Sequence, residues 1–206
     1  MIYSLQHNFI FISNPKTGST TIERLFKKYL KPHEYITSKD INMSKHARNY
    51  ELRELPNYLT AKKFVFIRNP WERTYSWFTY LRGLDQESFD PEIGWENRSI
   101  YGLEGAVGNF KTFIHTAPEW VFSNNYMWCV NKFGQNDIYN IGTMENFAKD
   151  VCFMMNSIGI SLTEDQIPHN NKSKKWMEYR ERYNDEMREV VAEKFKLDIE
   201  IFKFEF

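Results

Sequence analysis

The chain has 206 residues, with 27 Lys and Arg against 27 Asp and Glu, so its formal net charge at pH 7 is zero. This balance argues against binding nucleic acid or an anionic membrane through bulk charge, and 42% hydrophobic residues with 26% charged residues argue against a disordered chain. We therefore expect one globular domain over residues 1–206, with no nucleic acid among its partners.

Cysteine content and hydropathy narrow the class further. Cys129 and Cys152 are too few for a disulfide framework, and the sequence contains no Cys and His spacing typical of a zinc site. No apolar stretch approaches the roughly 18 residues that a membrane helix needs, and residues 1–8 lack the pattern of a signal peptide. We expect a soluble cytoplasmic protein without a membrane span and without a metal.

The first strong element is Phe9–Ile12, a continuous apolar run that predicts a buried parallel strand. Residues 14–19 interrupt the apolar pattern. Apolar side chains then recur with the i, i+3, i+4, i+7 spacing of an amphipathic helix. These side chains belong to Ile22, Leu25, Phe26 and Tyr29.

The same order of elements returns twice. Phe64–Ile67 predicts a second strand, followed by a helix over residues 71–81 with Pro70 in its first turn and Asn69 as its cap. Ile138–Ile141 predicts a third strand, followed by a helix from Phe147 to Ile158.

Two regions complete the pattern. Residues 86–133 predict mainly helix and loop, and the C-terminal third predicts helices with one apolar stripe. That stripe comprises Met187, Val190, Val191 and Phe195. Strand–turn–helix units in series predict an α/β fold. We expect a three-layer, P-loop-NTPase-like arrangement, in which a central parallel sheet is flanked by helices and followed by a helical C-terminal part.

The segment Pro15–Thr21 has the composition of an anion-binding loop between a strand and a helix. Gly18 allows the backbone to curl so that successive N–H groups point at one spot, and the helix N-terminus adds its positive end. The hydroxyl groups that follow Gly18 are further donors, and Lys16 supplies a full positive charge. The alternative is an ordinary polar turn with a Ser or Thr cap.

This loop differs from the Walker pattern GxxxxGK[ST], because Lys16 precedes Gly18 and no glycine stands at the first position. Pro-Lys-Thr-Gly-Ser-Thr instead resembles the 5′-phosphosulfate loop of sulfotransferases that use 3′-phosphoadenosine 5′-phosphosulfate (PAPS). The segment Arg68–Ser76 is similar to the RNPxxRxxS element that binds the 3′-phosphate of PAPS in the same family. We expect Arg68 at the carboxyl end of a strand beside the first, where open α/β sheets bind ligands, and Ser76 converging on the same phosphate.

The resemblance extends along most of the chain and is nearest to the carbohydrate branch, the heparan 2-O and chondroitin or dermatan sulfotransferases. Ser44–Ala47 resembles their His-bearing segment, and Ile141–Phe147 resembles their IGRxEN junction. Pro168–Ser173 resembles their PHxNxS segment, and Asp198–Phe202 resembles their tail. The resemblance implies transfer of a sulfuryl group from PAPS to an acceptor hydroxyl, which yields 3′-phosphoadenosine 5′-phosphate (PAP). The resemblance to that branch implies a carbohydrate as the acceptor.

Sulfuryl transfer requires in-line placement, charge neutralisation and a base for the acceptor hydroxyl. We assign Lys16 to the charge on the bridging oxygen. Among the five histidines, His46 is the preferred base, because its loop should return to the carboxyl edge of the sheet and matches the family segment. His169 and Glu145 remain alternatives, although Glu145 is also placed to cap its own helix.

The remaining assignments concern the nucleotide. Met144 is a candidate adenine contact, and the basic segment around Ser173 and Lys175 is a candidate closure over the 3′-phosphate or an ordinary solvated turn. The residues assigned to PAPS are Pro15, Lys16, Thr17, Gly18, Ser19, Thr20, Thr21, Arg68, Ser76, Met144, Ser173 and Lys175. Two other functions stay open, a P-loop nucleotide kinase and a non-catalytic protein that retains PAP or PAPS binding.

Overall fold

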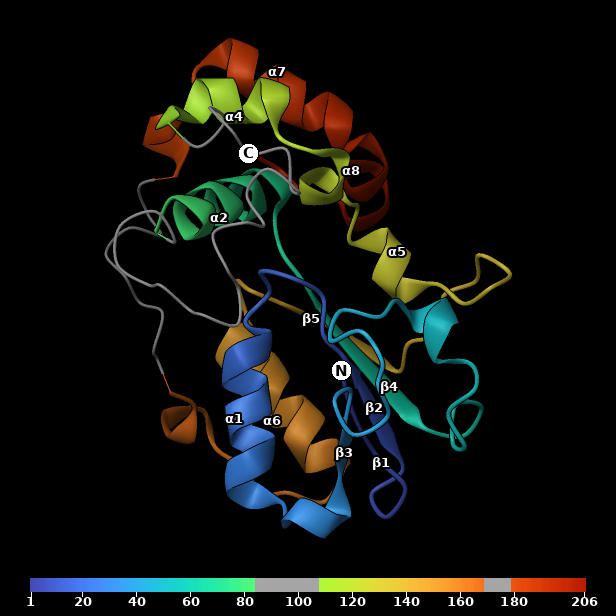
Figure 1. Ribbon diagram of the computed structural model, residues 1–206. Coiled ribbons are helices and arrows are strands. Elements are labelled where there is room, and N and C mark those ends of the chain that lie inside the picture. Colours follow the sequence, from blue (N-terminus) through green and yellow to red (C-terminus); the bar gives the residue numbers. More distant parts are fainter. Residues whose placement is uncertain (84–107, 169–178) are drawn as a thin grey trace. The chain divides into compact units, whose positions relative to one another are not determined.

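The computed structural model describes residues 1–83, 108–168 and 179–206, and the chain divides into two compact units (Figure 1). The first unit comprises residues 1–68 and 125–171, and the second comprises residues 69–124 and 172–206. Each unit has its own cluster of buried apolar side chains. One domain over residues 1–206 stays a prediction.

The first unit contains a five-stranded sheet in the order β3-β1-β2-β4-β5. Its strands are β1 (Ile2–Ser4), β2 (Phe9–Ile12), β3 (Ile36–Thr37), β4 (Lys62–Ile67) and β5 (Asn140–Thr143). Its helices are α1 (Ser19–Tyr29), α5 (Tyr126–Cys129) and α6 (Phe147–Ser157). The neighbours β2, β4 and β5 are parallel, whereas β1 is antiparallel to both β2 and β3. The predicted α/β fold with a parallel core is confirmed, and an antiparallel edge extends it.

The antiparallel edge formed by β1 and β3 was not predicted. The sequence pattern predicts neither β1 nor β3, because three and two residues are too few to show a strand periodicity. A tight turn joins β1 to β2, and Asn8 in this turn adopts a left-handed φ of 47°. The turn permits antiparallel pairing without a crossover helix.

Alternate side chains of β2 and β4 form the main core with α1 and α6. Phe9, Phe11, Phe64 and Phe66 are at most 1% exposed and belong to one apolar cluster with both helices. The Phe9 ring stacks on Phe26 of α1 with 4.9 Å between ring centroids. In Figure 1 these two helices lie on the same side of the strands. This packing explains why the predicted apolar spacing of α1 was correct.

The third strand lies two residues later than the sequence pattern predicts. It begins at Asn140, paired with Phe64, and continues through Gly142, paired with Phe66. A Cβ atom on Gly142 would lie only 2.5 Å from Cε1 of Phe66. The ring of Phe66 therefore occupies the space above a glycine that propensity alone would place outside a strand.

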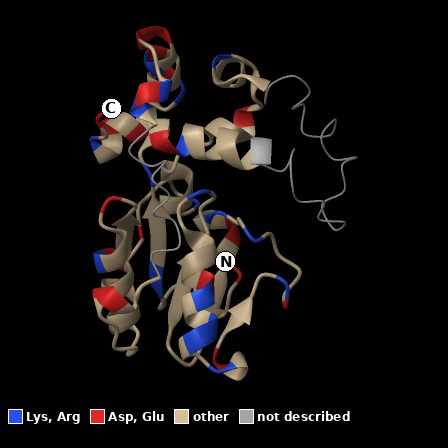
Figure 2. Cartoon of the chain, turned by 90° about the vertical axis from the view of Figure 1, so that its left-hand side faces the viewer, with Lys and Arg blue, Asp and Glu red and all other residues tan. Residues whose placement is uncertain are grey.

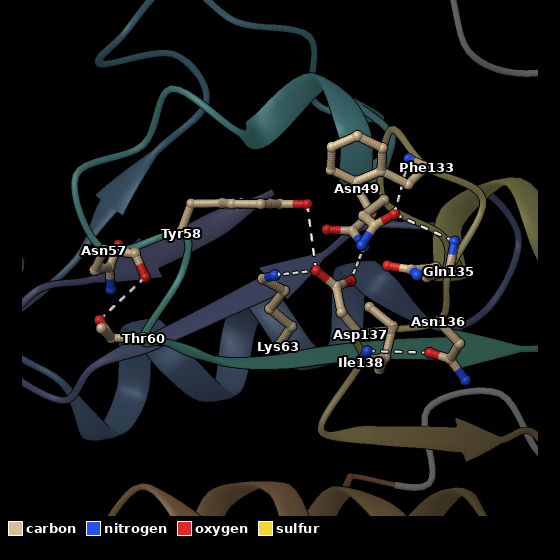
Figure 3. A network of polar contacts seen from close by, with 11 residues as sticks. Asn49, Asn57, Tyr58, Thr60, Lys63, Phe133, Gln135, Asn136, Asp137 and Ile138 are labelled. Atoms are coloured by element: carbon tan, nitrogen blue, oxygen red, sulfur yellow. Dashed lines mark hydrogen bonds and ion pairs between the residues drawn. The ribbon is translucent and has the colours of Figure 1, made fainter.

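A polar network anchors the chain segment that follows His46 to β4 (Figure 3). Lys63 is 4% exposed, and its Nζ lies 2.6 Å from Oδ2 of Asp137. Asn49 donates to the other carboxylate oxygen at 2.5 Å. The Lys63 ammonium also lies 3.6 Å from the centroid of the Tyr58 ring. Burial, followed by the charge of Asp137, raises the pKa of Tyr58 to about 12, so the phenol stays neutral at physiological pH.

The second unit is helical where it is described. Its helices are α2 (Pro70–Gly83), α4 (Phe110–Thr116), α7 (Asp185–Lys194) and α8 (Lys196–Phe202). The predicted cap of α2 is confirmed, because Asn69 Oδ1 accepts a hydrogen bond from the backbone N–H of Trp71 at 3.1 Å. Met187, Val191 and Phe195 are buried in one apolar cluster, which confirms the C-terminal stripe. Figure 2 shows both signs of charge distributed over the chain.

Candidate functional site

The loop between β2 and α1 has the backbone geometry of an anion cradle. Lys16 and Gly18 both adopt left-handed conformations, with φ of 64° and 76°. Thr17 is fully buried, and its hydroxyl donates to the carbonyl oxygen of Asn14 at 2.8 Å. Gly18 precedes α1 and has no side chain with which to cap it, so N–H groups of the first turn face the loop without a capping side chain from that position.

Gly18 is also required by its surroundings. A Cβ atom at this position would lie 2.6 Å from Cε2 of Phe147 and 3.5 Å from Sδ of Met144. The junction between β5 and α6 therefore packs directly against the loop. This contact places Met144, which the sequence assigns to the nucleotide site, beside Gly18.

We expect Gly18→Ala to destabilise the protein more than Gly134→Ala does, as measured by urea unfolding. Gly134 has a similar φ of 74° but no atom within 4 Å of a built Cβ, so its substitution adds only backbone strain, about 1–2 kcal/mol. At Gly18 the overlap with Phe147 should add about 1–3 kcal/mol. Equal losses in the two variants would show that the contact with Phe147 does not constrain the loop.

Two cationic side chains meet at the carboxyl ends of β2 and β4. Arg68 follows β4 directly, is 7% exposed, and donates from Nη1 to the carbonyl oxygen of Lys16 at 2.9 Å. Burial and then the charge of Arg68 lower the pKa of Lys16 to about 7. The predicted position of Arg68 beside the end of the first core strand is confirmed. An anion bound here would relieve the repulsion between the two cations.

His46 lies at the same edge of the sheet, as its loop predicts. Its Nδ1 is 2.7 Å from the carbonyl oxygen of Ser13, the residue after β2. Because a carbonyl only accepts hydrogen bonds, Nδ1 carries the proton and Nε2 keeps the lone pair of the neutral ring. Burial lowers the pKa of His46 below its ordinary value, and the hydrogen bond to Ser13 opposes this shift only partly. His46 therefore has the tautomer and the charge state of a base.

Two residues around His46 were not predicted. Glu23 of α1 accepts a hydrogen bond from the Ser13 hydroxyl at 3.3 Å and pairs with Lys45 at 3.2 Å. Trp128 of α5 donates from Nε1 to the carbonyl oxygen of His46 at 3.2 Å. The position of Glu23 in the second turn of the helix after the anion loop could have indicated that it lies near this site. Nothing in the sequence links Trp128 to a histidine 82 positions earlier.

The other histidines in the described ranges lie elsewhere. His7 occupies the turn at the amino end of β2, with Nδ1 3.3 Å from the carbonyl oxygen of Ile158. His33 is exposed in a 3₁₀ turn after α1. His115 lies on α4, 3.5 Å from Glu186. These positions agree with the preference for His46.

The carboxylate that holds the start of α6 differs from the predicted one. The sequence suggests Glu145 as the cap, but Asp150 accepts the hydrogen bond from the backbone N–H of Thr143 at 2.8 Å. Asp150 lies in the first turn of α6, and its carboxylate faces back toward the junction. Glu145 is exposed.

The structure does not place several of the predicted site residues beside Lys16, Arg68 and His46. Ser76 lies on α2 in the second unit, so its convergence with Arg68 stays a prediction. His169, Ser173 and Lys175 lie outside the described residues. Within residues 1–83, 108–168 and 179–206, no helix has the length and apolarity to span a membrane. The same ranges contain no cluster of three His, Cys, Asp or Glu suited to a metal ion.

These features define an α/β protein with a cationic, loop-and-helix site at the carboxyl edge of its sheet. A family model described as the sulfotransferase family matches residues 1–205, and the chain belongs to that family. No curated protein and no solved structure matches it. Family membership supports an enzyme that moves a sulfuryl group from a sulfonate donor to a hydroxyl acceptor.

Proposed function

We propose that this protein transfers a sulfuryl group from PAPS to an acceptor hydroxyl of a carbohydrate, giving PAP and a sulfate ester. The observation that carries the proposal is the convergence of Lys16 and Arg68 beside the N-terminus of α1, with His46 at the same edge of the sheet. A donor with phosphates at both its 3′ and 5′ positions carries negative groups that can form charge-assisted hydrogen bonds with these two cations.

The loop Pro15–Thr21 is proposed to hold the 5′-phosphosulfate in a P-loop-like manner. Backbone N–H groups after Gly18 and the hydroxyl groups of Ser19, Thr20 and Thr21 are the donors in this proposal, together with the charge of Lys16. Met144 lies beside Gly18, which supports its assignment to the nucleotide. The lysine precedes the glycine, and this order favours a phosphosulfate donor over the ATP of a nucleotide kinase.

In the chemical step, His46 Nε2 takes the proton of the acceptor hydroxyl as the oxygen attacks sulfur. The bond between sulfur and the bridging oxygen of the phosphosulfate breaks, and the charge that develops on that oxygen is neutralised by Lys16. The proton of the hydroxyl ends on His46, and PAP leaves with the bond's electron pair. One well-aimed donor to developing charge contributes roughly 2.7–4 kcal/mol to lowering the barrier.

The carbohydrate acceptor is supported by the resemblance of Ser44–Ala47 and Ile141–Phe147 to the carbohydrate branch. Both segments contribute to the site, since His46 contacts Ser13 and Met144 lies beside Gly18. Incubation of the enzyme with sulfur-labelled PAPS and pools of sugar, lipid and phenol acceptors tests the assignment. Label transferred only to lipids or phenols would contradict the carbohydrate proposal, and no transfer to any pool would favour the non-catalytic binding protein.

Arg68 and Ser76 are assigned to the 3′-phosphate. We expect Arg68→Ala to weaken binding of PAP much more than binding of adenosine 5′-phosphosulfate, because only PAP carries a 3′-phosphate for the guanidinium. Ser76→Ala should show the same selectivity with a smaller loss. Titration calorimetry with both ligands measures the two affinities. Equal losses for both ligands in Arg68→Ala would assign Arg68 a purely structural role.

A further inference from the structure

The buried side chain of Asn125 links the ends of β2 and β4. Its Oδ1 accepts from Nδ2 of Asn14 at 2.9 Å and from the backbone N–H of Arg68 at 3.4 Å. Its Nδ2 donates to the carbonyl oxygen of Arg68 at 3.0 Å. Asn14 also donates from Nδ2 to the carbonyl oxygen of Phe66 at 3.0 Å. Both amides are 0% exposed, so their hydrogen bonds form away from water.

These contacts hold the backbone of Arg68, which lies just after the last paired residue of β4. The strand pairing of β4 with β2 ends at Val65, and its pairing with β5 ends at Ile67. The amide of Asn125 then binds both the N–H and the C=O of Arg68, as a residue of a neighbouring strand would. The backbone of Arg68 is thereby held at both of its polar groups.

The fixed backbone of Arg68 sets the point and the direction from which its side chain extends. The side chain extends from this fixed backbone to the carbonyl oxygen of Lys16, at 2.9 Å from Nη1. Thr17 fastens the same loop to the carbonyl oxygen of Asn14. Asn14 and Asn125 therefore connect the anion loop and Arg68 into one hydrogen-bonded unit, which spans 111 positions of the sequence.

We propose that Asn125 is a positioning residue that aims the Arg68 guanidinium at the 3′-phosphate of an adenosine bisphosphate. This inference rests on the proposed function. A guanidinium that is already held in place loses less conformational freedom when the phosphate binds. Asn125 contributes to the preference for the 3′-phosphorylated nucleotide without touching the nucleotide itself.

The test compares the affinities of PAP and adenosine 5′-monophosphate, which differ only in the 3′-phosphate. Asn125→Ala should raise the Kd of PAP by about tenfold or more, because the charged group is no longer aimed, and should leave the Kd of adenosine 5′-monophosphate within about threefold. In an Arg68→Ala background the same substitution should not change the ratio of the two Kd values further, because its effect acts through Arg68.

Asn57→Ala is the matched control. Asn57 is also buried and donates its amide to a backbone carbonyl, that of Ser4 at 3.0 Å, but it lies at the amino end of the sheet. This variant should lose stability without changing the preference for PAP. If Asn125→Ala does not fold, Asn125→Ser retains one hydroxyl for either polar group of Arg68 and should give an intermediate loss of preference.

The outcomes separate the two proposals. A wild-type protein without any preference for PAP over adenosine 5′-monophosphate would overturn the proposed nucleotide and this inference together. A preference that Arg68→Ala abolishes but that both Asn125 variants retain would overturn the positioning role alone. Equal loss of affinity for both nucleotides in the Asn125 variants would also overturn it, because a merely structural residue would give that result.

Discussion

Replacing His46 with alanine is expected to lower turnover by about 10²–10⁴-fold, because the acceptor hydroxyl loses its base. Binding of PAP should change little, since the ring of His46 is assigned to the acceptor and not to the nucleotide. The hydrogen bond from Nδ1 to Ser13 leaves Nε2 as the nitrogen that takes the proton. Steady-state rates together with calorimetric PAP affinities measure both effects.

The pH profile of the rate distinguishes a base from a structural histidine. Burial lowers the pKa of His46 below 6.5, so the neutral ring dominates at pH 7 and the wild-type rate should fall only below pH 6.5. The titratable groups that act on this ring are Lys45, Glu23 and the chain's amino group. Burial lowers the pKa of that amino group to about 5, so it is mostly neutral over the range in which His46 titrates. His46→Ala should lose the acid limb, and the exposed His33→Ala should keep both the limb and the rate. A His46→Ala enzyme that retained both would transfer the role to His169 or Glu145.

Lys16→Ala is expected to lower turnover by roughly 10²–10³-fold, because no cation then neutralises the departing bridging oxygen. The affinity for PAP should stay within about tenfold, since backbone donors and Arg68 still hold the phosphates. Single-turnover kinetics separates the chemical step from binding. The exposed Lys27→Ala in the last turn of α1 serves as the control and should keep full turnover.

The lowered pKa of Lys16 gives this residue a second signature. With a pKa of about 7, Lys16 is mostly neutral at pH 8 in the free protein, and a bound phosphate favours its charged form. Binding of PAP at pH 8 should therefore take up protons, and the affinity should fall as pH rises above 7. Calorimetry in buffers of different ionisation enthalpy measures the uptake, which Lys16→Ala should abolish. If Lys16→Ala took up as many protons on binding PAP as the wild-type protein does, a group other than Lys16 would be the one that is protonated.

The sequence predicts the elements whose apolar side chains repeat regularly. The helix after the anion loop and the strands around Phe11 and Phe66 were correct, because one core buries all of them. The last core strand was predicted two residues too early. The sequence pattern does not place Gly142 in a strand, whereas in the structure the ring of Phe66 lies over this glycine. Strands β1 and β3 were not predicted, because their short segments become strands only through pairing. A tight turn brings β1 against β2, and β3 then pairs with β1.

Some residues of the candidate site could also be predicted from the sequence, and others could not. Lys16, Arg68 and His46 were predicted, because each follows a strand or belongs to a recognisable segment, and the structure places all three at one edge of the sheet. Asn125 was not predicted. Its contacts with Arg68 join residues 57 positions apart, and an isolated asparagine carries no periodic signal.

Thermal unfolding with PAP, compared with ATP and Mg²⁺, tests the central claim most directly, because a ligand that binds the folded state at 100 times its Kd stabilises it by about 2.7 kcal/mol. We predict that PAP raises the melting temperature without any magnesium and that ATP with Mg²⁺ does so much less. A rise that occurs only with ATP and Mg²⁺ would contradict the account and favour a nucleotide kinase.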